Sequence, residues 1–448
     1  MILRRFALCV FALLLSLSLQ AAEPSKPNIV FIMADDLGWA DVAFHGGHAP
    51  TPQLDRLARE GLELTQHYVA PVCSPTRTGL LTGRCWSRFG VTSPQNPRAL
   101  PWDTVTLPRA LKSAGYDTCL SGKWHLGSLP EQGPNHFGFD HSYGSLAGGV
   151  SPWNHQYKQG PFTQTWHRNE KLIEEPGHVT DLIAAEAIKW LESRGTAPFF
   201  LYVPYTAVHL PIKEPEEWLS RVPSNIEGDV PRHYAACVMH LDDAVGRIVS
   251  ALEKTGKRNN TLLVFTSDNG GSTVENNDLK YPDDNCPNGK LTGNNTPWRG
   301  QKGDLYEGGT RVPTMVSWPG RITPGQVSTP VQITDWMPTF CALAGYQPAQ
   351  DLKWDGRNIA SLLFDRSELP ERPLYAVAPG WRARSLRLGN WKLIVHGTGD
   401  ARRIELFDMV RDARESTNLA EQQPERIKQL LAKLEEAAAR DRDAVAKD

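Results

Sequence analysis

The sequence has few cysteines, almost no net charge and only one long apolar run. Its 7 cysteines among 448 residues do not have the spacing of a compact disulfide framework or a zinc finger, which excludes a small scaffold held together by either. The formal net charge of -2 lacks the broad basic excess that draws a protein to nucleic acid or an anionic membrane surface. We therefore expect no nucleic-acid partner, and any recognition of an anion must be local.

The one long apolar run spans residues 6–19 and has the order of a cleaved secretory signal. Two arginines precede it, and small residues follow it. The alternative is an uncleaved membrane anchor, but a spanning helix needs about 20 apolar residues. We expect a signal peptide at residues 1–22, export to the periplasm or the medium, and no membrane insertion after cleavage. In a eukaryotic host the same signal would lead to the ER lumen and the lysosome.

The rest of the chain reads as an α/β protein. Short apolar runs that end in polar residues are typical of strands buried on both faces of a parallel sheet, and they occur at residues 28–33, 199–203 and 262–266. Helical patterns separate these runs, and Thr51-Pro52 has the form of a helix cap followed by a first-turn proline. Strands that alternate with helices predict a sandwich with a large, mainly parallel sheet between helices.

The pattern changes after about residue 345. Short alternating runs at residues 373–377 and 391–395 are followed by an amphipathic helix around residues 427–434. We therefore expect a larger domain at residues 23–345 and a smaller C-terminal domain at residues 346–448, with an antiparallel sheet and a helix. Residues 272–297 are dense in Asn, Asp, Gly and Pro, which predicts a long surface loop.

Polar side chains follow two of the expected strands at the point where each strand ends. Asp35 and Asp36 come after the first strand, and Asp268 and Asn269 come after the last. Ligand sites of open α/β sheets gather beyond the carboxyl ends of the strands. Three carboxylates and an amide oxygen would suit calcium or magnesium rather than zinc, and calcium is the better guess. The alternative for either pair alone is ordinary turn chemistry.

Cys73 stands just before an expected helix, which is a second indication of a ligand site. Ser74 and Pro75 have the form of the N-cap and first position of a helix that runs toward Gly83, so Cys73 would lie just before a helix N-terminus that favours an anion. The plainer reading is a capped helix with a structural cysteine before it.

Longer stretches decide between these readings. Residues 70–84 read APVCSPTRTGLLTGR, residues 115–127 read GYDTCLSGKWHLG, and residues 300–313 read GQKGDLYEGGTRVP. Together with the two strand-end pairs and a C-terminal stretch from Glu405 to Leu419, they occur in the order of, and resemble, the motifs of the type I (formylglycine-dependent) sulfatase family, whose members are arylsulfatase-like.

The resemblance implies an alkaline phosphatase-like fold in which residues 23–345 form the catalytic sulfatase domain. It implies that a formylglycine-generating enzyme oxidises Cys73 to formylglycine on the unfolded chain. The hydrated aldehyde has two hydroxyls, of which one attacks sulfur and the other expels sulfate. The metal, Ca²⁺ rather than Mg²⁺, would be held by a set of residues that the family motifs identify: Asp35, Asp36, Asp268, Asn269 and the modified Cys73.

The same resemblance assigns roles to five further side chains. Arg77 would stabilise the hydrated aldehyde, and His125 is the best-placed base for its second hydroxyl. Lys123 and Lys302 would bind the sulfate oxygens, and either Lys302 or His209 would contact the substrate and protonate the leaving alcohol. His209 lies outside the matched motifs and rests on its position after an expected strand. Taken singly, such residues are more often solvated lysines or buried structural histidines.

The sequence leaves the substrate open. The leading hypothesis is a sulfatase acting on a sulfated carbohydrate or an aryl-type sulfate. The first alternative is a phosphonate monoester hydrolase or phosphodiesterase on the same scaffold. The second is a non-catalytic binder of sulfated glycans, although the motif residues are all present.

Overall fold

A computed structural model describes residues 26–277, 281 and 285–447. The expected signal peptide, residues 1–22, lies outside the described residues. Within them, no helix combines the length and the apolar character that crossing a membrane requires.

The larger part of the structure is built on one mixed, ten-stranded sheet. The five central neighbours pair in parallel, and antiparallel strands flank them. In spatial order the strands are β11 (Gly325–Val327), β2 (Leu62–Leu64), β10 (Met315–Ser317), β9 (Thr261–Ser267), β1 (Asn28–Ala34), β8 (Phe199–Pro204), β4 (Asp117–Ser121), β5 (His141–Ser145), β6 (Trp166–Arg168) and β7 (Lys171–Leu172). A separate two-stranded sheet pairs β3 (His67–Tyr68) with β12 (Val331–Gln332).

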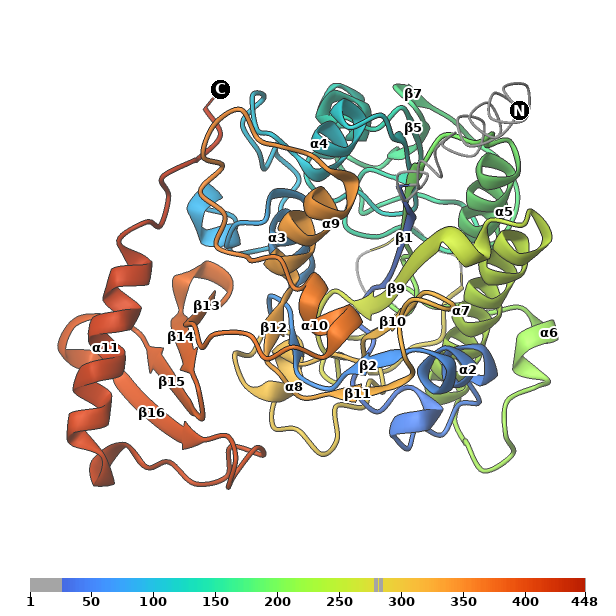
Figure 1. Cartoon of the computed structure of the whole chain (residues 1–448). Helices are drawn as coiled ribbons and strands as arrows, with labels where there is room; N and C mark the ends of the chain where they lie inside the picture. Colours follow the sequence, from blue (N-terminus) through green and yellow to red (C-terminus); the bar gives the residue numbers. More distant parts are fainter. Residues whose placement is uncertain (1–25, 278–280, 282–284, 448) are drawn as a thin grey trace, which may run out of the picture.

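Both faces of this sheet are covered by helices. Along β1, alternate side chains enter two different core clusters: Ile29, Phe31 and Met33 face one, and Val30, Ile32 and Ala34 face the other. This is the arrangement that the continuous apolar run predicts. Figure 1 shows the two helical layers on either side of the sheet.

The helices of the first layer are α3 (Cys73–Thr82), α4 (Leu107–Ser113), α9 (Trp336–Ala344) and α10 (Ala360–Asp365). Those of the second layer are α2 (Pro52–Glu60), α5 (Val179–Glu192), α6 (Glu216–Leu219) and α7 (Asp229–Lys254). The short α8 (Glu307–Thr310) lies within the later lysine motif, residues 300–313.

The C-terminal part is a four-stranded antiparallel sheet with one long helix against it. Its elements are β13 (Leu374–Val377), β14 (Ala383–Leu388), β15 (Trp391–His396), β16 (Arg403–Asp408) and α11 (Pro424–Ala438). Leu386, Leu393 and Leu430 belong to the same core cluster as Trp86 and Trp336 of the larger part. The predicted fold class is therefore confirmed, whereas the division of the chain at residues 345 and 346 stays a prediction.

Three local expectations are corrected or refined by the structure. Ser74 is not an N-cap: α3 begins at Cys73 itself, after Val72. The Ser74 hydroxyl donates instead to the His125 carbonyl, at 2.9 Å, so it joins two motifs rather than capping a helix. Thr51 does stand at the N-cap of α2, but its hydroxyl donates to Asp55 rather than accepting from the helix backbone.

The third correction concerns the loop at residues 272–297. It contains no helix or ladder strand among its described residues, as predicted, but it is not only a surface feature. Asn277 and Leu291 are almost fully buried, and Asn277 bonds the backbone of Ile212 at 2.6 and 2.8 Å. The loop is packed onto the domain and forms one wall of the cavity described below.

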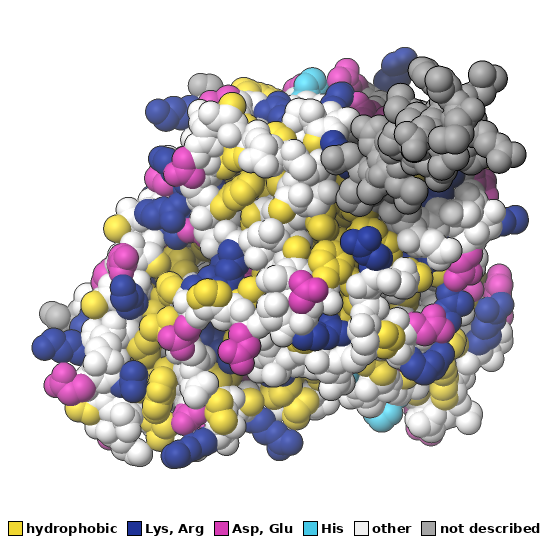
Figure 2. Space-filling model, viewed as in Figure 1, with side chains coloured by type: hydrophobic (Ala, Val, Ile, Leu, Met, Phe, Trp, Pro, Cys, Tyr) yellow, Lys and Arg dark blue, Asp and Glu magenta, His cyan; other side chains and the backbone are white. Residues whose placement is uncertain are grey.

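Figure 2 shows Lys and Arg side chains interspersed with Asp and Glu over the visible face. This mixing agrees with the net charge of -2. Concentrated charge is found in the interior instead, at the carboxyl ends of the central strands.

Candidate active site

The two strand-end pairs meet because their strands are neighbours. β1 and β9 pair in parallel with Ala34 opposite Ser267, so the residues that follow each strand leave the sheet side by side. The Asp36 backbone N–H donates to Asp268 Oδ1 at 3.2 Å, and Asn269 Nδ2 donates to Asp36 Oδ1 at 2.7 Å. The structure therefore brings Asp35, Asp36, Asp268 and Asn269 together, as expected.

Two oxygens of this group lack partners in the described part of the chain. Asp35 and Asn269 are fully buried, and Asp35 Oδ1 and Asn269 Oδ1 form no hydrogen bond there to any described residue. Burial, and then the neighbouring Asp268, raises the pKa of Asp35 well above its usual value. Unsatisfied buried oxygens are costly, so this donor set fits a hard cation such as calcium.

Cys73 and Arg77 reach this group from α3. Cys73 Sγ lies within 4.8 Å of carboxylate oxygens of both Asp35 and Asp268. The Arg77 guanidinium is fully buried; it donates to Asp268 Oδ2 at 2.8 Å and to the Lys123 carbonyl at 2.6 Å. Burial raises the pKa of the Cys73 thiol to about 11, so the unmodified side chain is a protonated thiol at neutral pH.

Lys123 and His125 follow β4 after a required glycine. A Cβ at residue 122, where φ is +139°, would lie 1.9 Å from the Pro204 carbonyl oxygen, so only glycine lets β4 pass β8 here. The next residue, Lys123, is fully buried and forms an ion pair with Asp35. The matched signature thus places a buried ammonium beside the carboxylates.

The His125 ring lies against the backbone of Gly148. A Cβ there would come within 2.5 Å of the ring, so this approach also requires glycine. The Nδ1 atom of His125 is buried without a hydrogen-bond partner among the described residues. Burial, helped by Lys123, lowers the pKa of His125 well below its usual value, so the ring is neutral and able to accept a proton.

His209 and Lys302 complete the constellation. His209 Nε2 lies 3.8 Å from Asp36 Oδ2, and the Lys302 ammonium lies 2.7 Å from the same oxygen and 2.8 Å from Glu275 Oε2. Burial opposes the charge on Lys302, but Asp36 and Glu275 outweigh it and raise the pKa of Lys302 well above its usual value. Burial and then Lys302 lower the pKa of His209. Lys302 is thus a cation and His209 a neutral ring.

These side chains line a cavity of about 480 Å³. Cys73, His125, His209 and Lys302 are joined there by four residues that the sequence did not single out: Tyr157, Lys158, Glu275 and Arg382. The cavity is large enough for a saccharide-sized ligand.

Comparison with known proteins decides the family. The Sulfatase family model matches residues 27–346. The chain belongs to the sulfatase family. A second model, N-sulphoglucosamine sulphohydrolase, C-terminal, matches residues 300–443 of this sulfatase. Its relatives are named as sulfatases, and the chain is accordingly a sulfuric ester hydrolase of alkaline phosphatase-like fold.

Two curated relatives cover most of this sulfatase. Arylsulfatase J of Mus musculus is 31% identical over 92% of this chain and 76% of the relative. N-acetylgalactosamine-6-sulfatase of Mus musculus is 33% identical over 84% of this chain and 73% of the relative. Among solved structures, Ps i-CgsB in complex with k-i-k-neocarrahexaose superposes with a TM-score of 0.82, at 30% identity and 95% coverage of both chains.

The missed cavity residues gave only weak signals in the sequence. Lys158 lies in a glycine-rich stretch with no family motif, and Glu275 lies in the loop interpreted as surface. Arg382 comes from the C-terminal part, where it donates to the Gly303 carbonyl next to Lys302. Their place in the site depends on how distant segments pack, which no local pattern encodes.

Proposed function

We propose that this sulfatase hydrolyses a sulfate monoester of a sulfated glycan, using a formylglycine made from Cys73 and a bound calcium ion. The observation that carries the proposal is the position of Cys73. Cys73 is the first residue of α3 and lines the cavity, beside the carboxylates of Asp35 and Asp268. Asp35 Oδ1 and the nearby Asn269 Oδ1 are buried without hydrogen-bond partners among the described residues.

Asp35, Asp36, Asp268 and Asn269 would hold the calcium ion together with residue 73. Their oxygens are the hard donors that calcium takes, and the unpartnered Asp35 Oδ1 and Asn269 Oδ1 are the atoms that a cation would satisfy. When bound, the ion would act as a Lewis acid and a template for the sulfate group.

The state of Cys73 supports the modification. A buried thiol with a pKa of about 11 is a poor nucleophile at neutral pH. Hydrated formylglycine would supply two hydroxyls, one for attack on sulfur and one for release of sulfate.

Cationic side chains and histidines of this chain would neutralise charge on the sulfate and transfer protons. Lys123 and Lys302 lie where they would neutralise charge on the sulfate oxygens, and Arg77 would hold the nucleophile's geometry through Asp268. The neutral His125 would accept a proton from residue 73. Lys302, a cation at the cavity, would donate one to the leaving alcohol; His209, the alternative donor, is neutral and would first have to take up a proton.

The substrate class follows from the outer part of the cavity. Lys158 and Arg382 add cationic groups beyond the catalytic residues, and the Lys158 ammonium lies over the ring of Tyr157 at 5.3 Å. Such a rim suits a saccharide that carries a second anionic group besides the sulfate being cleaved. N-acetylgalactosamine-6-sulfatase and the complex of Ps i-CgsB with k-i-k-neocarrahexaose, both among the similar proteins, agree with a glycan substrate.

Export through the signal at residues 1–22, and maturation by a formylglycine-generating enzyme, are part of the same proposal. The signal would direct the protein out of the cytoplasm, where sulfated glycans are encountered, and the modification would supply its nucleophile.

Paired aryl sulfate and aryl phosphodiester substrates test the reaction class. We expect a much larger kcat/KM on the sulfate, because the carboxylates, the cations and Cys73 match the sulfatase motifs. A larger kcat/KM on the phosphodiester would favour the phosphonate and phosphodiester hydrolases instead. Binding of sulfated glycans without turnover of either substrate would favour the non-catalytic binder.

A further inference from the structure

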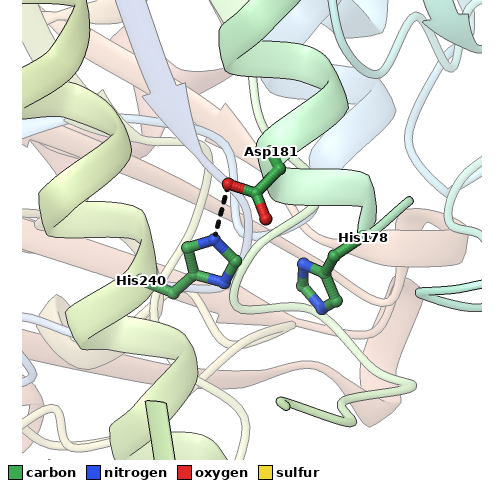
Figure 3. Close-up of side chains that lie close together, drawn as sticks. All are labelled: His178, Asp181 and His240. Atoms are coloured by element: carbon green, nitrogen blue, oxygen red, sulfur yellow. Dashed lines mark ion pairs between the residues drawn. The ribbon is translucent and has the colours of Figure 1, made fainter. Parts of the chain in front are cut away.

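A second group of metal-ligating side chains lies in the α5 and α7 layer. His178 is the N-cap of α5, Asp181 lies in its first turn, and His240 lies on α7. Each offers a ligand atom, and the three atoms lie within 4.8 Å of one another. Figure 3 shows the three side chains facing a common space between the two helices. None of them lines the cavity that contains Cys73.

The His240 ring is oriented as a metal ligand would be. Its Nδ1 lies 2.7 Å from Oε2 of Glu214, a carboxylate with only 3% exposure. A carboxylate that accepts from one ring nitrogen fixes the tautomer and leaves the other nitrogen with a lone pair for a cation. That other atom, Nε2, is buried and forms an ion pair with Asp181, the dashed line in Figure 3, but it has no geometric hydrogen bond among the described residues.

The distance across the group also fits a shared ion. His240 Nε2 lies 3.2 Å from Asp181 Oδ1 but without hydrogen-bond geometry. Two atoms that bind one tetrahedral zinc at about 2.0–2.1 Å lie roughly 3.3 Å apart, and their lone pairs point at the ion rather than at each other. The rings of His178 and His240 are 4.8 Å apart at their centroids, which keeps both within reach of one ion.

Access and charge favour a cation at this point. His178 and His240 are buried, but the Asp181 side chain is 48% exposed and opens the group to solvent. Asp181 and Glu214 bring two negative charges, and Arg247, 2.8 Å from Asp181, brings one positive charge. Burial opposes a charge on His240, but Asp181 and Glu214 outweigh it and raise the pKa of His240 to about 9, so at neutral pH the ring carries a second proton that a metal ion would have to displace.

We propose that His178, Asp181 and His240 form a site for a zinc-like transition metal ion, oriented by Glu214 and separate from the sulfatase centre. Two imidazoles and one carboxylate are ligands that zinc prefers, with water in the fourth position on the exposed side. The ion would tie the start of α5 to α7. It would also restrict the motion of Trp153, whose ring packs edge-on against His178 with the centroids 5.1 Å apart.

Zinc titration in the presence of millimolar calcium tests this site directly, because calcium keeps the oxygen-rich centre occupied. We expect one equivalent of Zn²⁺ per chain by calorimetry and by metal analysis after gel filtration. Cobalt alone should give the visible absorption bands of a tetrahedral ion. Asp181→Asn should weaken zinc binding by about 100-fold or more, since loss of a ligand exceeds the 10–100-fold cost of losing a supporting partner.

Asp243→Asn is the matched control. Asp243 also pairs with Arg247, at 3.1 Å, and its side chain is 47% exposed, but it contributes no atom to the group. We expect its zinc affinity to equal that of the wild type. His178→Gln, checked for folding by circular dichroism, should lose the site as Asp181→Asn does. Absence of stoichiometric zinc binding to the wild type would overturn the proposal and leave an ion-pair cluster. Equal zinc binding by Asp181→Asn would overturn it as well.

Discussion

Two buried clusters of charge in this sulfatase are built in opposite ways. The first is the proposed catalytic centre at the ends of β1 and β9. The second lies where α8 meets the C-terminal sheet, and its centre is Lys392, whose ammonium lies 2.9 Å from Glu307 and 2.8 Å from Glu415. Both clusters place several ionised groups out of water, which costs free energy unless partners compensate.

The difference lies in how the oxygens are used. In the Lys392 cluster, Glu307 Oε2 also accepts from Tyr68 at 2.8 Å, and Glu415 Oε2 accepts from the Glu307 backbone at 2.7 Å. Each carboxylate oxygen therefore has a cation or a donor of the protein beside it, although Glu415 Oε1 meets Lys392 as an ion pair without a geometric hydrogen bond. In the catalytic centre, Asp35 Oδ1 and Asn269 Oδ1 have none among the described residues. We infer that the first arrangement serves the fold, whereas the second would be completed by a bound cation.

The largest expected effect is the loss of sulfatase activity when Cys73 is replaced. Cys73→Ala should lower kcat/KM on an aryl sulfate by at least about 10⁴-fold, because it removes the nucleophile while leaving the fold intact. Steady-state kinetics and circular dichroism would measure the two properties. Cys341→Ala, which removes a thiol of equal 1% exposure outside the cavity, should retain turnover.

Calcium should raise the free energy of unfolding through the cluster that contains Asp35, where oxygens lack partners, and not through the Lys392 cluster. At 1,000 times its dissociation constant, a ligand that binds the folded state alone raises the free energy of unfolding by about 4 kcal/mol. Asp35→Asn should lose most of this increase, because Asp35 supplies a central carboxylate. Thermal unfolding with calcium and with a chelator compares the two proteins. An equal calcium shift in Asp35→Asn would place the ion elsewhere.

The Lys392 cluster should respond to loss of its cation instead. Lys392→Met leaves Glu307 and Glu415 buried without their ammonium, which should lower the free energy of unfolding by about 3 kcal/mol in urea. Adding Glu415→Gln to that variant should recover part of the loss. Lys433→Met removes a surface ion pair with Glu436 and should cost less than about 0.5 kcal/mol. Equal effects of Lys392→Met and Lys433→Met would contradict the comparison.

The smallest predicted effect concerns the cavity rim. Arg382→Ala should raise KM for a disulfated saccharide about two- to fivefold relative to its monosulfated counterpart, as expected for one exposed charge contact worth up to about 1 kcal/mol. Arg411→Ala, whose side chain is 89% exposed and lies outside the cavity, should leave the ratio of the two KM values unchanged. An equal change on both saccharides in Arg382→Ala would show that Arg382 does not bind the second anion.

The sequence predicted much of the fold because its signals are local. The run at residues 28–33 became β1, buried on both faces, and its last position delivers Asp35 and Asp36 to the site. A signal of this kind needs only neighbouring residues. Lys123, His125 and Lys302 are different, because only the resemblance to the family motifs, and no local pattern, assigned them to one site.

What the sequence missed depends on packing between distant segments. The Ser74 hydroxyl could have capped α3, but the His125 carbonyl, 51 positions away, takes its hydrogen bond. Arg382 reaches the cavity only because the C-terminal sheet docks beside Gly303. His178 and His240 approach each other through the packing of α5 on α7, so their spacing in the sequence gives no metal pattern.

Mass spectrometry of the peptide that contains residue 73 tests the central claim most directly. The account predicts an aldehyde at residue 73 in protein expressed with a formylglycine-generating enzyme, and sulfatase activity proportional to the converted fraction. Full activity from protein in which residue 73 is entirely an unmodified thiol would contradict it.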